Sequence, residues 1–283
     1  MATPHSQGHE HAHPHTHGHG GHGHTSLAEK NKEYWNSAAD KAYTEKWTQD
    51  MQVQIKDHLT QNLAWLGINK DAGGDDVEGK KMLEYACGNG LPSRIFSPYF
   101  SQCIGIDISQ GMVNNYNAAA QTDGIPSSRM YAVQGDLTAA DISSTPTPSS
   151  LCPLNAEEFF NFDLIVISLA LHHIEDQQTL LTRFVERLNP SGRVLVIDLL
   201  TREGDELPNH DHQGHKYAED GKGNAAIDTI HHDKHSFSKE DMEKLLVGAG
   251  CKGGVGFELC KEVTVVPPSK SGEMQMFFAL GTK

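Results

Sequence analysis

The amino-acid sequence predicts an α/β fold, in which a mostly parallel β-sheet carries helices on both of its faces. From residue 81 onward, apolar runs short enough for buried strands alternate with segments of helical periodicity. Residues 162–168 and 193–199 are almost continuously apolar, as strands covered on both faces are. Strands that alternate with helices indicate βαβ units, and 283 residues suffice for one such domain with additional segments.

Local signals place the individual elements. We expect strands at residues 81–86, 103–108, 130–134, 162–168 and 193–199, and helices at 91–100, 112–121, 176–188 and 242–247. The run Asn189-Pro190-Ser191-Gly192 should end the third of these helices, and Ser238 with Asp241 forms a capping box before the fourth. Residues 253–266 and 275–280 predict an antiparallel pair at the sheet edge.

The expected organisation has three parts. Residues 1–26 contain nine of the 18 histidines among Gly, Pro, Thr and Ala, and this low-complexity composition predicts a disordered His-rich tail. Residues 27–74 have apolar positions at three- and four-residue steps and predict an N-terminal helical cap. Residues 75–283 form the α/β domain, with insertions at 143–160 and 201–235.

Composition excludes several classes of protein. The net charge of −14 argues against a protein that binds duplex nucleic acid. The apolar runs are too short for a membrane span, and the first 26 residues lack the apolar region of a secretory signal. Five cysteines without a C-x-x-C pair indicate a reducing compartment, so we expect the cytoplasm, with the nucleus as the alternative. The oligomeric state is left open.

A short glycine motif lies where the first strand leads into the first helix. Gly88 and Gly90 let the backbone approach a ligand there, at the edge where open α/β sheets bind ligands. Asp107 ends the second strand and can accept both ribose hydroxyls, and Asp136 follows the third strand and can accept from an adenine amino group. Glu84 would repel a pyrophosphate but attract an ammonium group. This order of acids favours S-adenosylmethionine over NAD.

The motifs resemble those of class I S-adenosylmethionine-dependent methyltransferases. The matching segments are E-x-x-C-G-x-G from Glu84, G-I-D-I-S from Gly105, G-D-L from Gly135, F-D-L-I-V-I-S-L-A-L-H-H-I from Phe162 and L-N-P-S-G-R-V from Leu188. Ala86 stands where the family usually has its first glycine. The resemblance implies a Rossmann-like, doubly wound, seven-stranded sheet. The His-rich head on this core also looks like fungal methyltransferases of the VapB type, which are associated with secondary metabolism.

Carried over by position, the resemblance implies a set of cofactor-binding residues. The methionine end would be held by Glu84, Gly88 and Gly90, with Ala86, Cys87 and Asn89 of the same loop, and the ribose by Asp107. Ile108 and Met112 would flank the adenine, Asp136 and Leu137 would lie at its edge, and Ser168 and Leu169 would face the sulfonium. For Ile108, Met112 and Leu137, ordinary core packing is the alternative.

Two further groups of residues are candidates on the acceptor side. His172 and His173 follow the fourth strand, and either imidazole could act as a general base; the alternative is a loop with one packed and one solvated histidine. Tyr34, Trp35 and Tyr43 could form a lid over the cofactor or contact the substrate, although aromatic residues at helical spacing are more often core.

Three functions remain open at this point. The first is methyl transfer to a small-molecule acceptor. The second is methylation of a protein, or a role as regulatory subunit with a protein partner in a nuclear complex that controls secondary metabolism and development. The third is a metal-handling or pH-sensing protein with a vestigial pocket, because six histidines lie in residues 201–235. We expect no bound metal, since histidines in polar segments are usually solvated.

Overall fold

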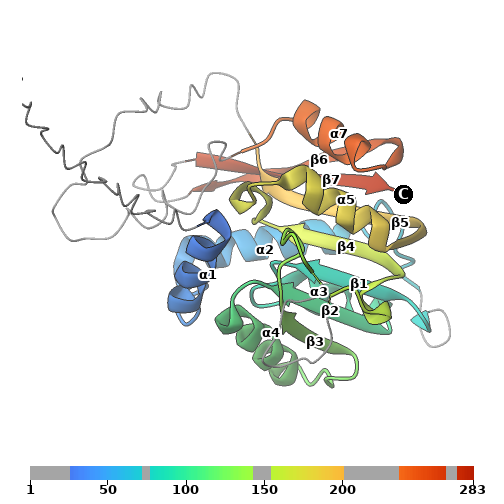
Figure 1. The fold of residues 1–283 in the computed structure, drawn as a ribbon. Helices are drawn as coiled ribbons and strands as arrows, with labels where there is room; N and C mark the ends of the chain where they lie inside the picture. Colours follow the sequence, from blue (N-terminus) through green and yellow to red (C-terminus); the bar gives the residue numbers. More distant parts are fainter. Residues whose placement is uncertain (1–25, 72–76, 143–153, 201–235, 266–272) are drawn as a thin grey trace, which may run out of the picture.

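A seven-stranded sheet forms the centre of the protein (Figure 1). The computed structural model describes residues 26–71, 77–142, 154–200, 236–265 and 273–283. The strand order is β3-β2-β1-β4-β5-β7-β6. The strands are β1 (Lys81–Tyr85), β2 (Gln102–Asp107), β3 (Met130–Gln134), β4 (Phe162–Ser168), β5 (Leu188–Leu199), β6 (Lys252–Val265) and β7 (Glu273–Thr282).

The strand pairing confirms the predicted doubly wound sheet. Neighbouring strands from β3 to β5 run parallel, whereas β7 pairs antiparallel with both β5 and β6. The expected antiparallel pair is therefore present. Its later strand, β7, is inserted between β5 and β6, so β6 forms the sheet edge.

The helices begin where the sequence supplies caps. Ser109 caps α4 (Gln110–Thr122), Asp176 caps α5 (Gln177–Arg187), and Ser238 with Asp241 forms the expected capping box of α7 (Lys239–Gly248). Gly90 precedes the short α3 (Leu91–Phe96), and a 3₁₀ turn, η2 (Ser97–Tyr99), completes the expected helix. Two further 3₁₀ turns are η3 (Glu157–Phe159) and η4 (Leu171–His173).

Two helices precede the sheet, α1 (Leu27–Ala38) and α2 (Lys46–Gln61). Ser26 caps α1 through a capping box with Glu29, so the boundary of the expected tail at residue 26 is corrected by one residue. Residues 1–25 lie outside the described residues. Of the α2 side chains, Met51, Ile55 and Leu59 are buried, whereas the buried side chain of α1 is Asn31.

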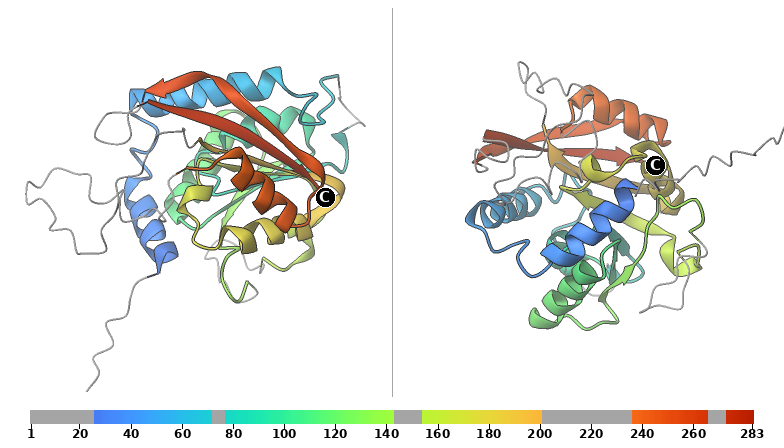
Figure 2. Two further views of the ribbon diagram at one scale, coloured as in Figure 1. Left: turned by 90° about the horizontal axis from the view of Figure 1, so that it is seen from above. Right: turned by 60° about the vertical axis from the view of Figure 1, so that its left-hand side comes forward.

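Each face of the sheet has its own hydrophobic core. One core contains alternate strand residues together with α5 and α7, and the other contains the intervening strand residues together with α2, α3 and α4. Figure 2 shows α2 and α7 on opposite sides of the β6–β7 ribbon. The period of two in the strands therefore decides which helix each side chain contacts.

Two expected boundaries differ from the structure. Leu188 already pairs with Phe162, so β5 begins before the expected turn, and residues 189–192 form an irregularity within the strand, with Ser191 at φ 66°. Leu154 and Phe159, near the end of the expected 143–160 insertion, are fully buried in the core that contains α5, so this end is not a surface insertion. The preceding residues, 143–153, lie outside the described residues.

The ends of the second expected insertion lie beside the sheet. Leu200 and Phe237 form a parallel bridge, whereas residues 201–235 and their six histidines lie outside the described residues. No helix in the described parts of the chain has the length and apolarity needed to cross a bilayer.

The chain leaves adjacent strands β1 and β4 toward opposite faces of the sheet. α3, which follows β1, packs in one core, and α5, which follows β4, packs in the other. The crevice between such strands is the usual ligand site of an open α/β sheet. Ala86 after β1 and Leu169 after β4 both have left-handed backbone, with φ 52° and 53°.

The left-handed conformation of Ala86 generates a stability prediction. Because Cβ is strained in this conformation, Ala86→Gly should raise the free energy of unfolding by about 0.5–1 kcal/mol, the strain relief exceeding the added chain entropy. Ala118→Gly, at an exposed position within α4, should instead lower it by about 1 kcal/mol. Urea denaturation measures both, and an equal loss in the two variants would contradict the strain.

Candidate functional site

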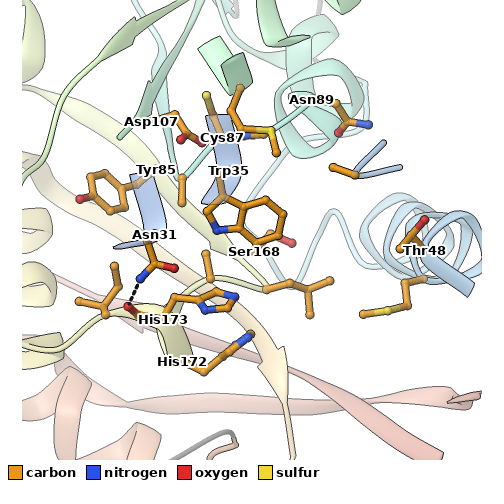
Figure 3. Close-up of a pocket in the computed structure, with 18 of the residues that line it drawn as sticks. Asn31, Trp35, Thr48, Tyr85, Cys87, Asn89, Asp107, Ser168, His172 and His173 are labelled. Carbon is orange, nitrogen blue, oxygen red and sulfur yellow. Dashed lines mark hydrogen bonds between the residues drawn. The ribbon is translucent and has the colours of Figure 1, made fainter. Parts of the chain in front are cut away.

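A cavity of about 1080 Å³ opens at the carboxyl ends of β1, β2, β4 and β5 and is covered by residues of α1 and α2 (Figure 3). Most of the expected site residues line it. They are Tyr34, Trp35, Tyr43, Glu84, Ala86, Cys87, Gly88, Asn89, Asp107, Ile108, Met112, Asp136, Ser168, Leu169, His172 and His173. The strand ends and the N-terminal helices thus bring residues far apart in sequence to one space.

The glycine loop is held by the carboxylate at the end of β2. The backbone amide of Gly88 donates to Asp107 Oδ2 at 3.1 Å, and the amide of Ser109 donates to Asp107 Oδ1 at 2.9 Å. Gly88 has φ 49°, and a Cβ at this position would collide with the hydroxyl of Tyr43. Glycine is therefore required at residue 88 both by the backbone and by the space above it.

Burial raises the pKa values of the two acids below the glycine loop, Glu84 and Asp107. Glu84 is buried, accepts a hydrogen bond from the Ser93 amide at 2.8 Å, and has its pKa raised to about 8 by desolvation. Desolvation also raises the pKa of Asp107 to about 6. A cation or a pair of hydroxyl donors would favour the charged forms, so this end of the cavity fits a ligand that carries such groups.

Helix α2 and the turn before it contribute polar side chains above the loop. The Tyr43 hydroxyl lies above Gly88 and 4.0 Å from Met112 Sδ. Asn89 Nδ2 donates to Gln52 Oε1 at 3.2 Å, which ties α2 to the loop. Tyr43 therefore lies at the end of the cavity that contains the glycine loop, and the Gln52 contact was not predicted from the sequence.

Of the residues expected at the adenine edge, the structure places Asp136 at the cavity and Leu137 in the core. Asp136 lines the cavity, and its Oδ1 accepts from the hydroxyl of Tyr85 at 3.0 Å and from the amide of Thr138 at 2.7 Å. Leu137 does not line the cavity: its side chain is fully buried in the core, and its amide donates to the Tyr85 hydroxyl at 3.2 Å. The Leu137 side chain therefore belongs to the core, which was the alternative expected for this residue.

Gly90 also does not line the cavity. Its left-handed φ of 71° forms the turn before α3, and a Cβ there would press against Tyr116 and Met130 on the far side. Its requirement for glycine therefore comes from the turn and from core packing.

The two histidines occupy different environments. His172 is buried, and its Nδ1 lies 2.7 Å from Oδ1 of Asp198, which is fully buried at the carboxyl end of β5. The ring of His173 contacts Trp35 of α1 edge-on at 5.8 Å between ring centroids. Asn31 Nδ2 donates to the His173 carbonyl at 3.2 Å, so α1 contacts η4 directly (Figure 3).

Several residues of the site were not predicted. The sequence did carry a signal for Asp198, because it is an acid at the carboxyl end of a buried strand, as Asp107 is. Tyr85 resembles any other apolar strand residue in the sequence, and Asn31 and Gln52 resemble solvated helix residues. Their contacts depend on how α1 and α2 lie across the sheet.

Within the described residues, no cluster of three or more His, Cys, Asp or Glu side chains could hold a metal ion. The histidines of residues 201–235, which raised the metal-binding alternative, are outside the described part of the chain.

The chain is similar in sequence to known methyltransferases. The model of the methyltransferase domain family matches residues 49–253. An uncharacterised methyltransferase of Schizosaccharomyces pombe is 37% identical over 124 residues, which are 43% of this chain and 39% of that protein. The uncharacterised methyltransferase YcgJ of Bacillus subtilis is 31% identical over 133 residues, 46% of each. The chain thus matches less than half the length of these relatives.

A solved structure shows the same fold. The magnesium protoporphyrin IX methyltransferase ChlM of Synechocystis, with bound S-adenosylmethionine, has a TM-score of 0.54 at 13% identity, and the alignment covers 91% of this chain and 98% of that one. At this identity the likeness concerns the fold alone. Because the family model covers well over half of the sequence, the chain belongs to the methyltransferase domain family.

Proposed function

We propose that the chain transfers a methyl group from S-adenosylmethionine to a small-molecule acceptor. The observation that carries this proposal is that the glycine loop and its acids, Glu84 and Asp107, line the same cavity as the histidines of η4. Ligand cavities in proteins usually measure ~300–1,000 Å³, so about 1080 Å³ leaves room for a nucleoside cofactor and a small acceptor. Residues of α1 and α2 cover the cavity, which favours a metabolite over a protein tail.

The residues present fit the cofactor. Glu84, buried with its charged form disfavoured, suits an ammonium group, and Asp107 suits two ribose hydroxyls. The cavity face of Asp136 suits an adenine amino group, with Ile108 and Met112 beside the base. S-adenosylmethionine supplies an electrophilic methyl group, and Ser168 and Leu169 would lie near its sulfonium. The protein must then align the acceptor and exclude water.

We assign residues 27–74 the role of a lid over residues 75–283. Tyr34 and Trp35 of α1 and Tyr43 before α2 line the cavity from the side opposite the strand ends. The Tyr34 and Trp35 rings contact each other edge-on at 5.0 Å, and the Trp35 ring also contacts that of His173. This aromatic side would exclude water and contact the acceptor. We also assign the role of general base to His172 or His173.

Cofactor binding is tested by titration with S-adenosylhomocysteine in a calorimeter. The intact protein should bind it with micromolar affinity. Gly88→Asp should abolish binding, because the added carboxylate collides with Tyr43 and repels the ligand's carboxylate. Asp107→Ala should weaken binding at least tenfold, about 1.4 kcal/mol, through the lost ribose acceptors. Asp50→Asn, at a half-buried acid on α2 that pairs with Lys46, is the charge-matched control. Folded protein without detectable binding would refute the proposed function.

The two raised pKa values generate a pH prediction. A bound ammonium and bound hydroxyls stabilise the carboxylate forms, so binding releases a proton whenever Glu84 or Asp107 is protonated in the free protein. Affinity for S-adenosylhomocysteine should therefore fall as pH drops below about 8, through Glu84, and more steeply below about 6, through Asp107. Asp107 and Arg94 are the charged groups that act on Glu84.

One variant tests which of the two acids causes each part of this pH dependence. Glu84→Gln should remove the upper part of the pH dependence and keep the part near 6, measured as the dissociation constant at each pH. An affinity that does not change between pH about 5 and about 8.5 would contradict the ionisation of both acids on binding.

A further inference from the structure

A buried ion-pairing group on the acceptor side of the cavity has no part in cofactor binding as proposed above. Asp198 has no solvent exposure, and its Oδ1 lies 2.7 Å from His172 Nδ1. Two backbone amides complete its hydrogen bonds: His172 N donates to Oδ2 at 3.3 Å, and Leu199 N donates to Oδ1 at 2.8 Å. The carboxylate is thus fixed from two sides and aimed at one nitrogen of the imidazole.

Adjacent strands bring this pair to the cavity. Ser168, the last residue of β4, pairs with Ile197 of β5, so Asp198 lies one residue beyond the end of β4. The chain turns at Leu169 into η4, which places His172 beside the end of β5. Figure 3 shows His172 and His173 on one side of Trp35, and Asp107 and Cys87 on the other. The pair therefore lies across the cavity from the glycine loop.

The hydrogen bond determines which nitrogen can act on a ligand. An ionised carboxylate only accepts hydrogen bonds, so in the neutral ring the proton is on Nδ1 and the lone pair is on Nε2. The carboxylate of Asp198 holds the imidazole ring in one orientation, with Nε2 facing away from it, as in other carboxylate–histidine pairs. Burying a carboxylate costs free energy, and the orientation of a proton-accepting His172 accounts for the presence of Asp198 here.

We propose that His172, oriented by Asp198, is the general base for an uncharged hydroxyl acceptor of the phenol class. This inference rests on the proposed methyl transfer. The hydroxyl proton passes to His172 Nε2, while the oxygen lone pair forms a C–O bond to the methyl carbon as the C–S bond breaks and its electron pair stays on sulfur. His172 then releases the proton to solvent. Asp198 is a positioning residue in this scheme, because it acts through His172.

The acceptor class follows from the need for a base and from the charge of the cavity. A phenolic hydroxyl ionises near pH 10, as tyrosine does, so it requires proton removal, whereas a thiol or an aromatic amine depends on it less. Besides the acids near the glycine loop, Glu45, Glu175, Asp176 and Glu273 line the cavity, and the described lining contains one lysine, Lys41. An anionic acceptor would be repelled, while Trp35 and Trp47 provide faces for a flat ring.

The test uses the ionisation of a chromogenic phenol and does not depend on turnover. Protein saturated with S-adenosylhomocysteine is titrated with 4-nitrophenol or 4-nitrocatechol, and phenolate absorbance is recorded against pH. Among the described residues, the titratable groups that contact His172 include Asp198 and the His173 ring, at 4.2 Å between centroids, and Glu175 and Glu273 line the same cavity. The variants are Asp198→Asn and His172→Gln, with Glu175→Gln as the charge-matched control in the same cavity.

We expect the wild type to lower the apparent pKa of at least one of the bound phenols by about one unit or more. Asp198→Asn and His172→Gln should abolish this shift, and Glu175→Gln should keep it. S-adenosylhomocysteine titration of each variant checks the fold, since affinity should change less than twofold.

Three outcomes would overturn the inference: no phenol binding to the cofactor-loaded protein, a shift that survives Asp198→Asn, or preferential methylation of 4-nitroaniline or 4-nitrothiophenol when S-adenosylmethionine is supplied. In each case, retained S-adenosylhomocysteine binding by the wild type would leave the proposed function standing. Loss of that binding would instead remove the proposed function itself.

Discussion

Two buried carboxylates and the backbone amides that they accept from determine the shape of the ligand end of this protein. Asp107 binds the Gly88 amide from the neighbouring strand, and Glu84 binds the Ser93 amide in the first helix. These bonds link β1, β2, the glycine loop and α3. The left-handed residues Ala86, Gly88 and Gly90 are maintained by this network. The loop conformation is therefore set by the protein itself, and a ligand does not have to organise it.

The same edge of the sheet has a second fixed point at β4 and β5. Strand pairing and two backbone amides hold Asp198, which in turn contacts His172. Asp107, at the end of β2, is held by two backbone amides in the same way. Both clusters consist of an acid at the end of a buried strand that accepts from the backbone of an adjacent loop. Rigid strands thus position the polar groups, whereas helices α1 and α2 supply the aromatic and amide side chains between them.

Sequence patterns predicted the parts of the fold and site that depend on local or periodic signals. The strands and the capping box at Ser238 follow from apolar runs and cap residues, and Glu84 and Asp107 follow from acids flanked by such runs. The irregularity at residues 189–192 could not be predicted, because the same residues also end helices. Leu137 was assigned to the ligand from motif position, although burial is the usual state of an apolar residue. Asn31, Gln52 and Tyr85 depend on long-range packing, which spacing in the sequence does not encode.

The way in which the two N-terminal helices are attached bears on how ligands enter and leave. α2 is held by buried apolar side chains, whereas α1 is held mainly by amide hydrogen bonds, from Asn31 to η4 and from Ser109 and Gly111 to Asn36. Water can replace those hydrogen bonds when α1 moves away, and little apolar area becomes exposed. Lifting α1 therefore costs less free energy than lifting α2. Under the proposed function, the exchange of spent cofactor would proceed beside α1 at a rate set by local opening, while the rest of the sheet stays folded.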